Sequence, residues 1–98
     1  MKYVVQLTES ANKEFFELTE YQQNRLLADF ELISEDGIEF VVTRPLLDKI
    51  LELKTDNIRS FFKYQKGQII IVALIVIKKS QKTPKEVLKL AQKRLKEY

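Results

Sequence analysis

The apolar run from Ile69 to Ile77, IIIVALIVI, constrains the fold of this 98-residue chain more than any other feature. Nine residues are too few to cross a membrane as a helix, which takes about 20. Most of the run is β-branched and no polar residue alternates with the apolar ones, a pattern typical of a strand buried on both faces. The sequence therefore predicts a sheet with this strand at its centre.

The first part of the chain predicts a strand followed by two helices. Residues 2–7, KYVVQL, place alternate apolar residues on one side, which indicates a short strand. Thr8 is a suitable N-cap for a first helix, and a second helix is expected from about Glu20 until Gly37 ends it. The apolar residues at helical spacing are Ala11, Phe15 and Leu18 in the first helix and Leu26, Leu27, Phe30 and Ile33 in the second.

After Gly37 the spacing of apolar residues changes towards a period of two. Residues 38–42 (IEFVV) read as a strand or extended segment that Arg44-Pro45 interrupts, since proline lacks the ladder donor. Residues 50–54 and 58–64 also alternate, and a tight turn around Gly67 leads into the apolar run. Strands joined by such short turns predict an antiparallel meander.

The last element is predicted to be a helix with a clear start. Thr83, Pro84 and Glu86 fit a capping box in which Thr83 is the N-cap and Pro84 the first helical residue. The expected order is β-α-α-β-β-β-α. This is an α+β fold in which a two-helix hairpin packs on a small, mostly antiparallel sheet, and residues 1–98 form a single domain.

Composition restricts the chemistry that the chain can perform. It has no cysteine, which excludes disulfides and thiolate catalysis, and no histidine, the usual general base and commonest metal ligand. No Gly-rich phosphate loop or metal-ligand cluster occurs, so we predict neither cofactor nor metal. The N-terminus lacks the apolar core of a secretory signal, and we expect a cytoplasmic protein without a membrane segment.

Charge is divided unequally between the halves of the chain. Residues 1–48 hold 4 Lys and Arg against 10 Asp and Glu, a net charge of −6, whereas residues 49–98 hold 13 against 4, a net +9. One interpretation is that the second half binds a polyanion. The other is that acidic helices lie against a basic sheet.

The basic residues of the second half follow the strand period. Alternation places Glu52 with Lys54 on one face of their strand, and Arg59 with Phe61 and Lys63 on one face of the next. Cations interleaved with an aromatic ring suit single-stranded RNA, because cations meet phosphates and rings stack on bases.

Lys78 and Lys79 follow the apolar run, and since neighbouring strand residues point to opposite faces, only one is expected to join Arg59.

Each of these residues also has a structural interpretation. Lys78, Lys79 and Lys82 can form a solvated strand end that prevents edge-to-edge aggregation. Arg59 can pair with Glu52 or Asp56. Of Phe61 and Phe62 one belongs to the core, and the other is a stacking platform or part of a second core layer.

Residues 46–94 resemble the RelE/HigB superfamily of type II toxins, most closely its phage-derived HigB-like branch. That branch shows a Glu-Leu-Arg-like triplet, a Tyr-Arg pair, an apolar strand and then Lys-Lys-Thr-Gln-Lys-Thr-Pro leading into a helix. The corresponding segments here are Glu52-Leu53-Lys54, Ile58-Arg59, Ile69 to Ile77, and Lys78-Lys79-Ser80-Gln81-Lys82-Thr83-Pro84.

The resemblance implies a toxin that cleaves messenger RNA without a metal, usually on the ribosome. It also implies a cognate antitoxin, often of the HigA-like type with a helix-turn-helix domain, and assemblies of toxin–antitoxin heterodimers. The catalytic residues expected from it are Lys54, Arg59 and Lys79, and the RNA-binding residues are Lys78, Lys82, Lys63 and Phe61.

The sequence departs from the family pattern where aromatic residues and histidine are expected. Ile58 and Val76 replace aromatics, no histidine is present, and Tyr98 stands at the very end, so the general acid and base stay open. Two other functions remain alternatives: a ParE-like inhibitor of DNA gyrase with the same architecture, and a nucleic-acid-binding module without catalysis.

Overall fold

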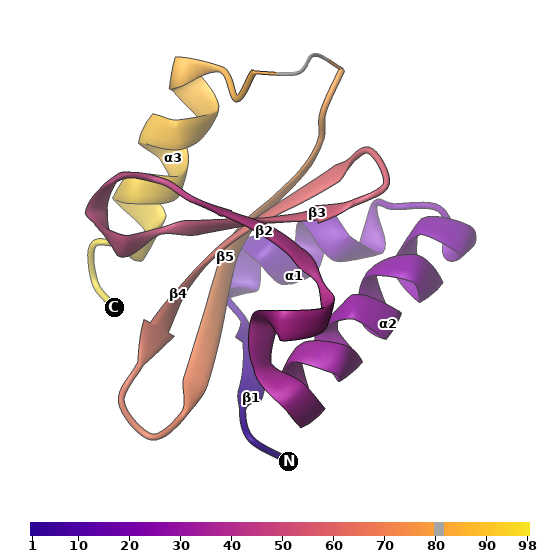
Figure 1. The fold of residues 1–98 in the computed structure, drawn as a ribbon. Helices are drawn as coiled ribbons and strands as arrows, with labels where there is room; N and C mark the ends of the chain where they lie inside the picture. Colours follow the sequence, from indigo (N-terminus) through magenta and orange to yellow (C-terminus); the bar gives the residue numbers. More distant parts are fainter. Residues whose placement is uncertain (80–81) are drawn as a thin grey trace.

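The fold is a five-stranded mixed sheet with helices on both faces, in a computed structural model that describes residues 1–79 and 82–98 (Figure 1). The strand order is β1-β5-β4-β3-β2; β1 runs parallel to β5 and the other pairs are antiparallel. This confirms the predicted α+β class. The elements are β1 (Val4–Leu7), α1 (Glu9–Phe16), α2 (Glu20–Asp36), the 3-10 helix η1 (Gly37–Phe40), β2 (Val42–Pro45), the 3-10 helix η2 (Leu47–Lys49), β3 (Leu51–Thr55), β4 (Ile58–Gln65), β5 (Ile69–Ile77) and α3 (Lys85–Leu95).

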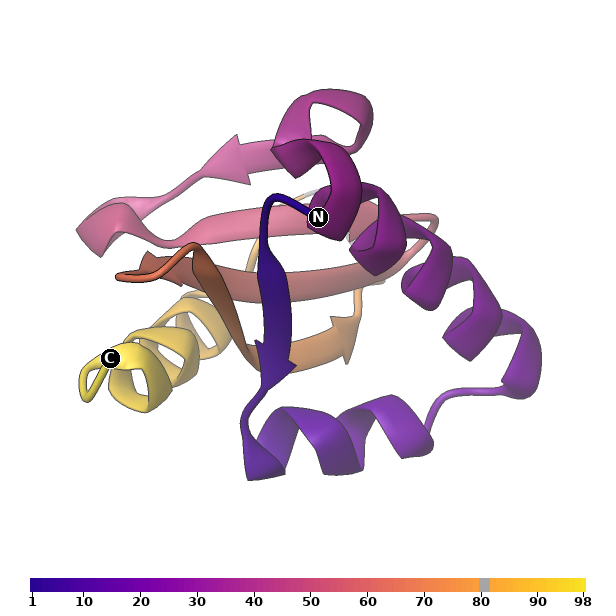
Figure 2. The same ribbon diagram turned by 90° about the horizontal axis from the view of Figure 1, so that it is seen from below.

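The apolar run forms β5, and it is buried on both faces as its composition predicts. Side chains of β5 belong to two separate core clusters on opposite sides of the sheet, and they alternate except at Ala73 and Leu74, where the register of β4 and β5 shifts. Ile70, Val72 and Ile75 pack with α1 and α2, whereas Ile71 and Ala73 pack with α3. The arrangement is visible in Figure 2, where α3 lies on the side of the sheet away from α1 and α2.

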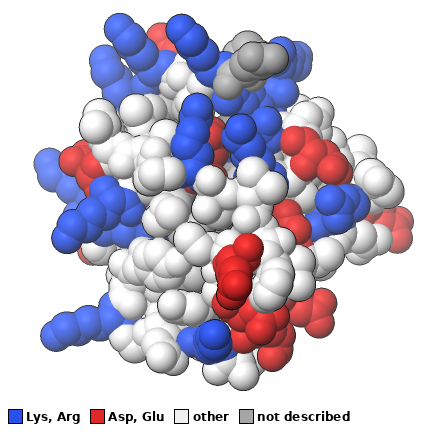
Figure 3. Space-filling view, in the orientation of Figure 1, with Lys and Arg blue, Asp and Glu red and all other residues white. Residues whose placement is uncertain are grey.

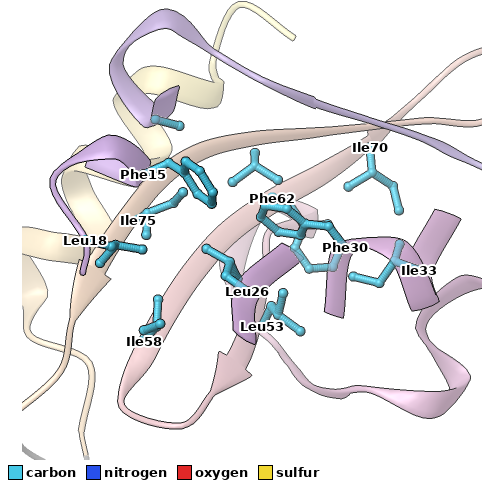
Figure 4. Packing of buried hydrophobic residues seen from close by; sticks show 12 residues of the cluster. Phe15, Leu18, Leu26, Phe30, Ile33, Leu53, Ile58, Phe62, Ile70 and Ile75 are labelled. Carbon is cyan, nitrogen blue, oxygen red and sulfur yellow. The ribbon is translucent and has the colours of Figure 1, made fainter. Parts of the chain in front are cut away.

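The larger cluster lies under the two-helix hairpin (Figure 4). Thr8 caps α1 as predicted, accepting a 3.2 Å hydrogen bond from Ala11 N, and Gly37 ends α2 with a φ of +80°. The spacing selects the buried residues Ala11, Phe15, Leu18, Leu26, Phe30 and Ile33, whereas Leu27 is exposed. Leu18 was expected in the first helix but lies in the connection between α1 and α2. Helical period therefore identified this face of the molecule.

Two details of the predicted order were wrong. Residues 37–40 form η1 rather than a strand, and the strand that follows, β2, runs from Val42 through Arg44 to Pro45. The order consequently contains four strands after α2 instead of three. Proline fits in β2 because β2 is the last strand of the sheet, where a missing N–H can face the open edge.

The predicted capping box of α3 is also absent. The helix begins at Lys85, its N-cap residue is Pro84, and no side chain caps it. The hydroxyl of Thr83 instead accepts a 2.8 Å hydrogen bond from Arg44 NH2 on β2 and donates one of 2.7 Å to Glu52 Oε2 on β3. A tertiary contact therefore replaces the local one.

Two charged side chains satisfy the edge of β5 beyond the end of β1. The parallel pairing stops at Leu7 opposite Val72, and past that point Ile75 N donates to Glu14 Oε1 at 3.0 Å. Arg94 NH1 donates to Ala73 O at 2.9 Å and lies equally close to Glu14 Oε2. The pair joins α1, β5 and α3 across the edge of the sheet, which otherwise would present unpaired backbone groups.

Across residues 1–79 and 82–98, no helix is long and apolar enough to span a bilayer.

Candidate functional site

Lys54 and Arg59 lie directly opposite each other on neighbouring strands. The register of the β3–β4 hairpin pairs Lys54 with Arg59, and Val76 of β5 stands on the other side of Arg59. Residues paired in this way have Cα atoms about 4.5–5.5 Å apart and point to the same face. The face is the one that α3 covers, because Phe61, two residues after Arg59, packs against α3. The structure therefore places Lys54 and Arg59 on one face of the sheet.

A pocket of about 250 Å³ opens on this face between the end of β5 and the start of α3. Figure 3 shows Lys and Arg side chains gathered in the upper part of the molecule, between α3 and the β3–β4 hairpin, while a large acidic group lies lower down, over α2 and η1. The pocket is therefore cationic. Its lining includes Glu52, Arg59, Phe61, Lys78, Lys79 and Thr83.

The Arg59 guanidinium is held by backbone carbonyls of the β3–β4 turn. Its NH1 donates to the carbonyl oxygens of Asp56 at 2.7 Å and of Ile58 at 3.0 Å. Neither carboxylate that the sequence offered as a partner binds it, since Asp56 pairs with Arg25 at 3.2 Å and Glu52 pairs elsewhere. The Arg59 Nε is buried and has no acceptor within the described part of the chain. A guanidinium whose plane is fixed at the wall of a pocket is suited to bind an anion there.

Lys78 is the lysine that joins Arg59. Its backbone N donates to Asn57 O at 2.7 Å, which extends the β4–β5 ladder beyond Ile77, and its side chain is half-buried on the Arg59 face. Burial lowers the pKa of the Lys78 ammonium; the Glu52 carboxylate opposes this shift, and the positive charges of Arg44, Arg59 and Lys54 add to it.

Lys79 also lines the pocket but is exposed. Strand alternation predicted that only one of the two lysines joins Arg59, and the resemblance named Lys79 as the catalytic one; in the structure Lys78 lies on the Arg59 face, and both lysines line the pocket.

A buried carboxylate supports the pocket from below. Glu52 has no exposed surface, and its Oε1 lies 2.8 Å from Arg44 NH2 on the neighbouring edge strand β2. Thr83 Oγ1 bonds to both partners, accepting from Arg44 NH2 at 2.8 Å and donating to Glu52 Oε2 at 2.7 Å. Lys78 Nζ lies 3.5 Å from the same hydroxyl. This network ties the segment that precedes α3 to β2 and β3.

Sequence reasoning missed Arg44 and the structural use of Thr83. Glu52 was recognised as a partner for a cation, but the cation was sought in Arg59. Arg44 stood beside a proline in a segment assigned as a strand break, and Thr83 fitted a local cap. Arg44 lies opposite Glu52 because of the register in which β2 pairs with β3. The order of residues within either strand does not reveal this register.

Of the residues predicted to bind RNA, Phe61 lines the Arg59 pocket but is buried, and Lys63 and Lys82 are not among the residues that line it. Phe61 belongs to the core under α3 and has no exposed surface, so its ring cannot act as a stacking platform, and both Phe61 and Phe62 are core residues. Lys63 lies four residues along β4 from Arg59 and lines a different pocket. Lys82 is exposed just before Thr83. Ser80 and Gln81, the middle of the quoted motif, lie outside the described residues.

The sequence matches the phage-derived protein Gp49-like family (DUF891) over residues 13–96. The chain belongs to this family. The match includes β2 to β5, α3 and both helices of the hairpin apart from the start of α1. No curated protein matches the sequence significantly.

Solved structures share the fold of this Gp49-like chain. A chain of the archaeal RelE–RelB complex from Pyrococcus horikoshii OT3 aligns with a TM-score of 0.66 and 13% identity, over 81% of the Gp49-like chain and 98% of the archaeal one. A chain of the toxin–antitoxin complex RelBE2 from Mycobacterium tuberculosis aligns with a TM-score of 0.57 and 14% identity, over 80% and 100%. The predicted kinship with the RelE superfamily is confirmed by the family match together with the shared fold.

Proposed function

We propose that this Gp49-like protein is the toxin of a type II toxin–antitoxin system and that it cleaves messenger RNA on the ribosome without a metal ion. The observation that carries the proposal is the register of Lys54 opposite Arg59 beside a cationic pocket that also contains Lys78 and Lys79. The two solved relatives come from toxin–antitoxin complexes, which supports a cognate antitoxin as partner. The HigA-like, helix-turn-helix type of antitoxin is part of the proposal and follows from the resemblance in sequence.

The proposed reaction is attack of a 2′-hydroxyl on the adjacent phosphorus. A new P–O2′ bond forms, the P–O5′ bond breaks, and the products are a 2′,3′-cyclic phosphate and a 5′-hydroxyl. The protein must accept the proton of the 2′-hydroxyl, stabilise the negative charge that accumulates on the phosphate oxygens, and protonate the leaving 5′ oxygen.

Arg59 is proposed to stabilise the charge on the phosphate. Its NH1 is already bound to the carbonyls of Asp56 and Ile58, which fixes the plane of the guanidinium before RNA arrives. A donor that is fixed in advance stabilises a transition state better than one that must be ordered during the reaction. Lys54, opposite Arg59, and the exposed Lys79 supply further positive charge to the same phosphate.

Lys78 is proposed to be the general base. Burial and three neighbouring cations lower the pKa of its ammonium, so more of it is neutral at a given pH than for an ordinary lysine. Only a neutral amine can take the 2′-hydroxyl proton. Lys54 or Lys79 then donates the proton to the 5′ oxygen.

The experiment that tests the function is induction of the protein in growing cells followed by mapping of messenger ends and measurement of DNA supercoiling. Cuts in phase with codons on translated messages, with supercoiling unchanged, are the expected result. Intact messages with blocked supercoiling would instead identify a gyrase inhibitor. Intact messages and normal supercoiling would leave a binding module without catalysis.

A further inference from the structure

A second cationic pocket lies on the α3 face of the sheet, away from Arg59. Its volume of about 570 Å³ makes it the larger of the two, and it is open at the C-terminal end of α3. Three lysines line it: Lys63 from β4, Lys93 from the last turn of α3, and Lys96 directly after the helix. In Figure 3 a second group of Lys and Arg side chains lies at the left, near the C-terminal part of α3.

The floor of this pocket is apolar and its one carboxylate is engaged. Ile50 and Leu95 are buried core residues that form the base. Asp48 accepts a 2.8 Å hydrogen bond from Gln92 Nε2, which holds it at the edge. The pocket therefore carries a surplus of positive charge over a rigid base, and the lysine side chains stand around it on two different elements.

The lysines are arranged as a continuation of the first pocket. Arg59 and Lys63 point to the same face of β4, four residues apart, which corresponds to about 13 Å along the strand. Lys93 lies in the last turn of α3 and Lys96 is the C-cap residue with helical backbone angles, so these two side chains, three residues apart, lie on one side of the helix end. The cations beside α3 thus extend in one direction from the Arg59 pocket, along the same face of the sheet.

We propose that Lys63, Lys93 and Lys96 bind the phosphate backbone of RNA outside the scissile position. The proposal rests on the proposed function, in which the Arg59 pocket receives the RNA. The chemistry favours phosphates because the site offers flexible ammonium groups and no exposed aromatic residue among its lining, so it grips the backbone without reading bases. Phosphates bound by these lysines would hold the RNA strand in place while the reacting phosphate occupies the Arg59 pocket.

The test measures binding of a short mixed-sequence 2′-O-methyl RNA oligonucleotide, which lacks the attacking hydroxyl and cannot be cleaved. Lys93→Gln and Lys96→Gln are combined, and the affinity is measured over a range of salt concentrations. Loss of two phosphate contacts to a single strand lowers the slope of log affinity against log salt by about 1.4. Affinity at 0.1 M salt then falls about 25-fold, if the curves meet at 1 M.

The matched control is the combination of Lys2→Gln and Lys13→Gln, which removes the same charge from exposed positions outside this pocket. Its salt slope is expected to stay near that of the unmodified protein. Equal losses in both double variants would mean that net charge alone acts, and would overturn the site. An unchanged slope for the Lys93 and Lys96 variant would overturn it as well.

Two further outcomes distinguish RNA binding at this pocket from binding of an acidic protein and from the proposed nuclease activity. Competition by polyglutamate as effective as by RNA would assign the pocket to an acidic protein surface and overturn the assignment to RNA. Intact messages in the induction experiment would overturn the nuclease, whereas a reduced salt slope with the uncleavable oligonucleotide would still support the binding site.

Discussion

Thr83 Oγ1 donates a 2.7 Å hydrogen bond to Oε2 of Glu52, a carboxylate without exposed surface that lies 31 residues earlier in the chain. The bond fastens the segment before α3 to β3 and so closes one side of the Arg59 pocket. A buried carboxylate is tolerable only when it is paired or hydrogen-bonded. Thr83 supplies a hydrogen bond at Oε2 and Arg44 an ion pair at Oε1, so both residues are structural requirements of the site.

Replacing Thr83 by valine is expected to lower the free energy of unfolding by about 1.5–3 kcal/mol, the usual contribution of a hydrogen bond to a charged group. Thr83→Ser keeps the hydroxyl and should lose far less. Chemical denaturation of both variants, repeated in a Glu52→Gln background, measures the coupling between the two residues. Effects that simply add would show that Thr83 acts without Glu52, for example as a local helix cap.

Replacing Arg59 by alanine is expected to slow RNA cleavage roughly 100- to 1000-fold, about 3–4 kcal/mol, by analogy with loss of a single fixed oxyanion donor. The fold should persist, because the Arg59 side chain binds only the backbone carbonyls of Asp56 and Ile58 among the described residues. Cleavage rates and circular dichroism of the variant check both statements. Arg59→Lys keeps the charge without the planar fork and should recover only part of the rate. Full activity in a folded Arg59→Ala protein would remove Arg59 from the mechanism.

The pH dependence of cleavage is expected to report Lys78. Its pKa is lowered from the usual 10.5, and the neutral amine is the reactive form. The rate should therefore rise about tenfold per pH unit and level off below pH 10.5. Spontaneous alkaline cleavage is subtracted by using the Arg59→Ala protein.

Lys78→Arg should abolish this rise, because arginine keeps its proton throughout the range. Lys79→Gln should lower the rate but keep the shape of the profile, since Lys79 is exposed. The reverse result, with the rise lost only in the Lys79 variant, would transfer the role of base to Lys79.

Loss of the Glu14–Arg94 pair is expected to loosen the end of β5. Arg94→Met leaves Ala73 O without its donor and leaves Glu14 without its cation. Both side chains are about a quarter exposed, so solvent replaces part of the interaction, and we expect a loss of about 1–2 kcal/mol. Amide hydrogen exchange at Ile75, whose N–H binds Glu14, should accelerate in Arg94→Met and more strongly in Glu14→Ala. Unchanged exchange at Ile75 in both variants would contradict this role.

Much of the fold was predictable because it depends on local periods. The nine apolar residues of β5 have no polar side, so they must be covered on both faces, and two sets of helices do this. The spacing of Phe15, Leu26 and Phe30 likewise selected the buried sides of α1 and α2. The predictions were wrong where tertiary contacts override local preference. Pro45 was expected to end a strand but pairs with Leu51 at the edge of the sheet, and Thr83 was expected to cap α3 but binds Glu52.

The sequence by itself determined that Lys54 and Arg59 each point to a definite side of a strand, because side chains alternate with a period of two. Only the tertiary structure decided which cations meet. Strand register set Lys54 opposite Arg59 and Arg44 opposite Glu52, and the continuation of β5 selected Lys78 over Lys79 for the Arg59 face. The period of two determines to which side of a strand each side chain points. The distances between strands and helices depend instead on how their surfaces pack. The packing of α3 on the sheet buries Phe61 and forms the separate pocket that Lys63 lines.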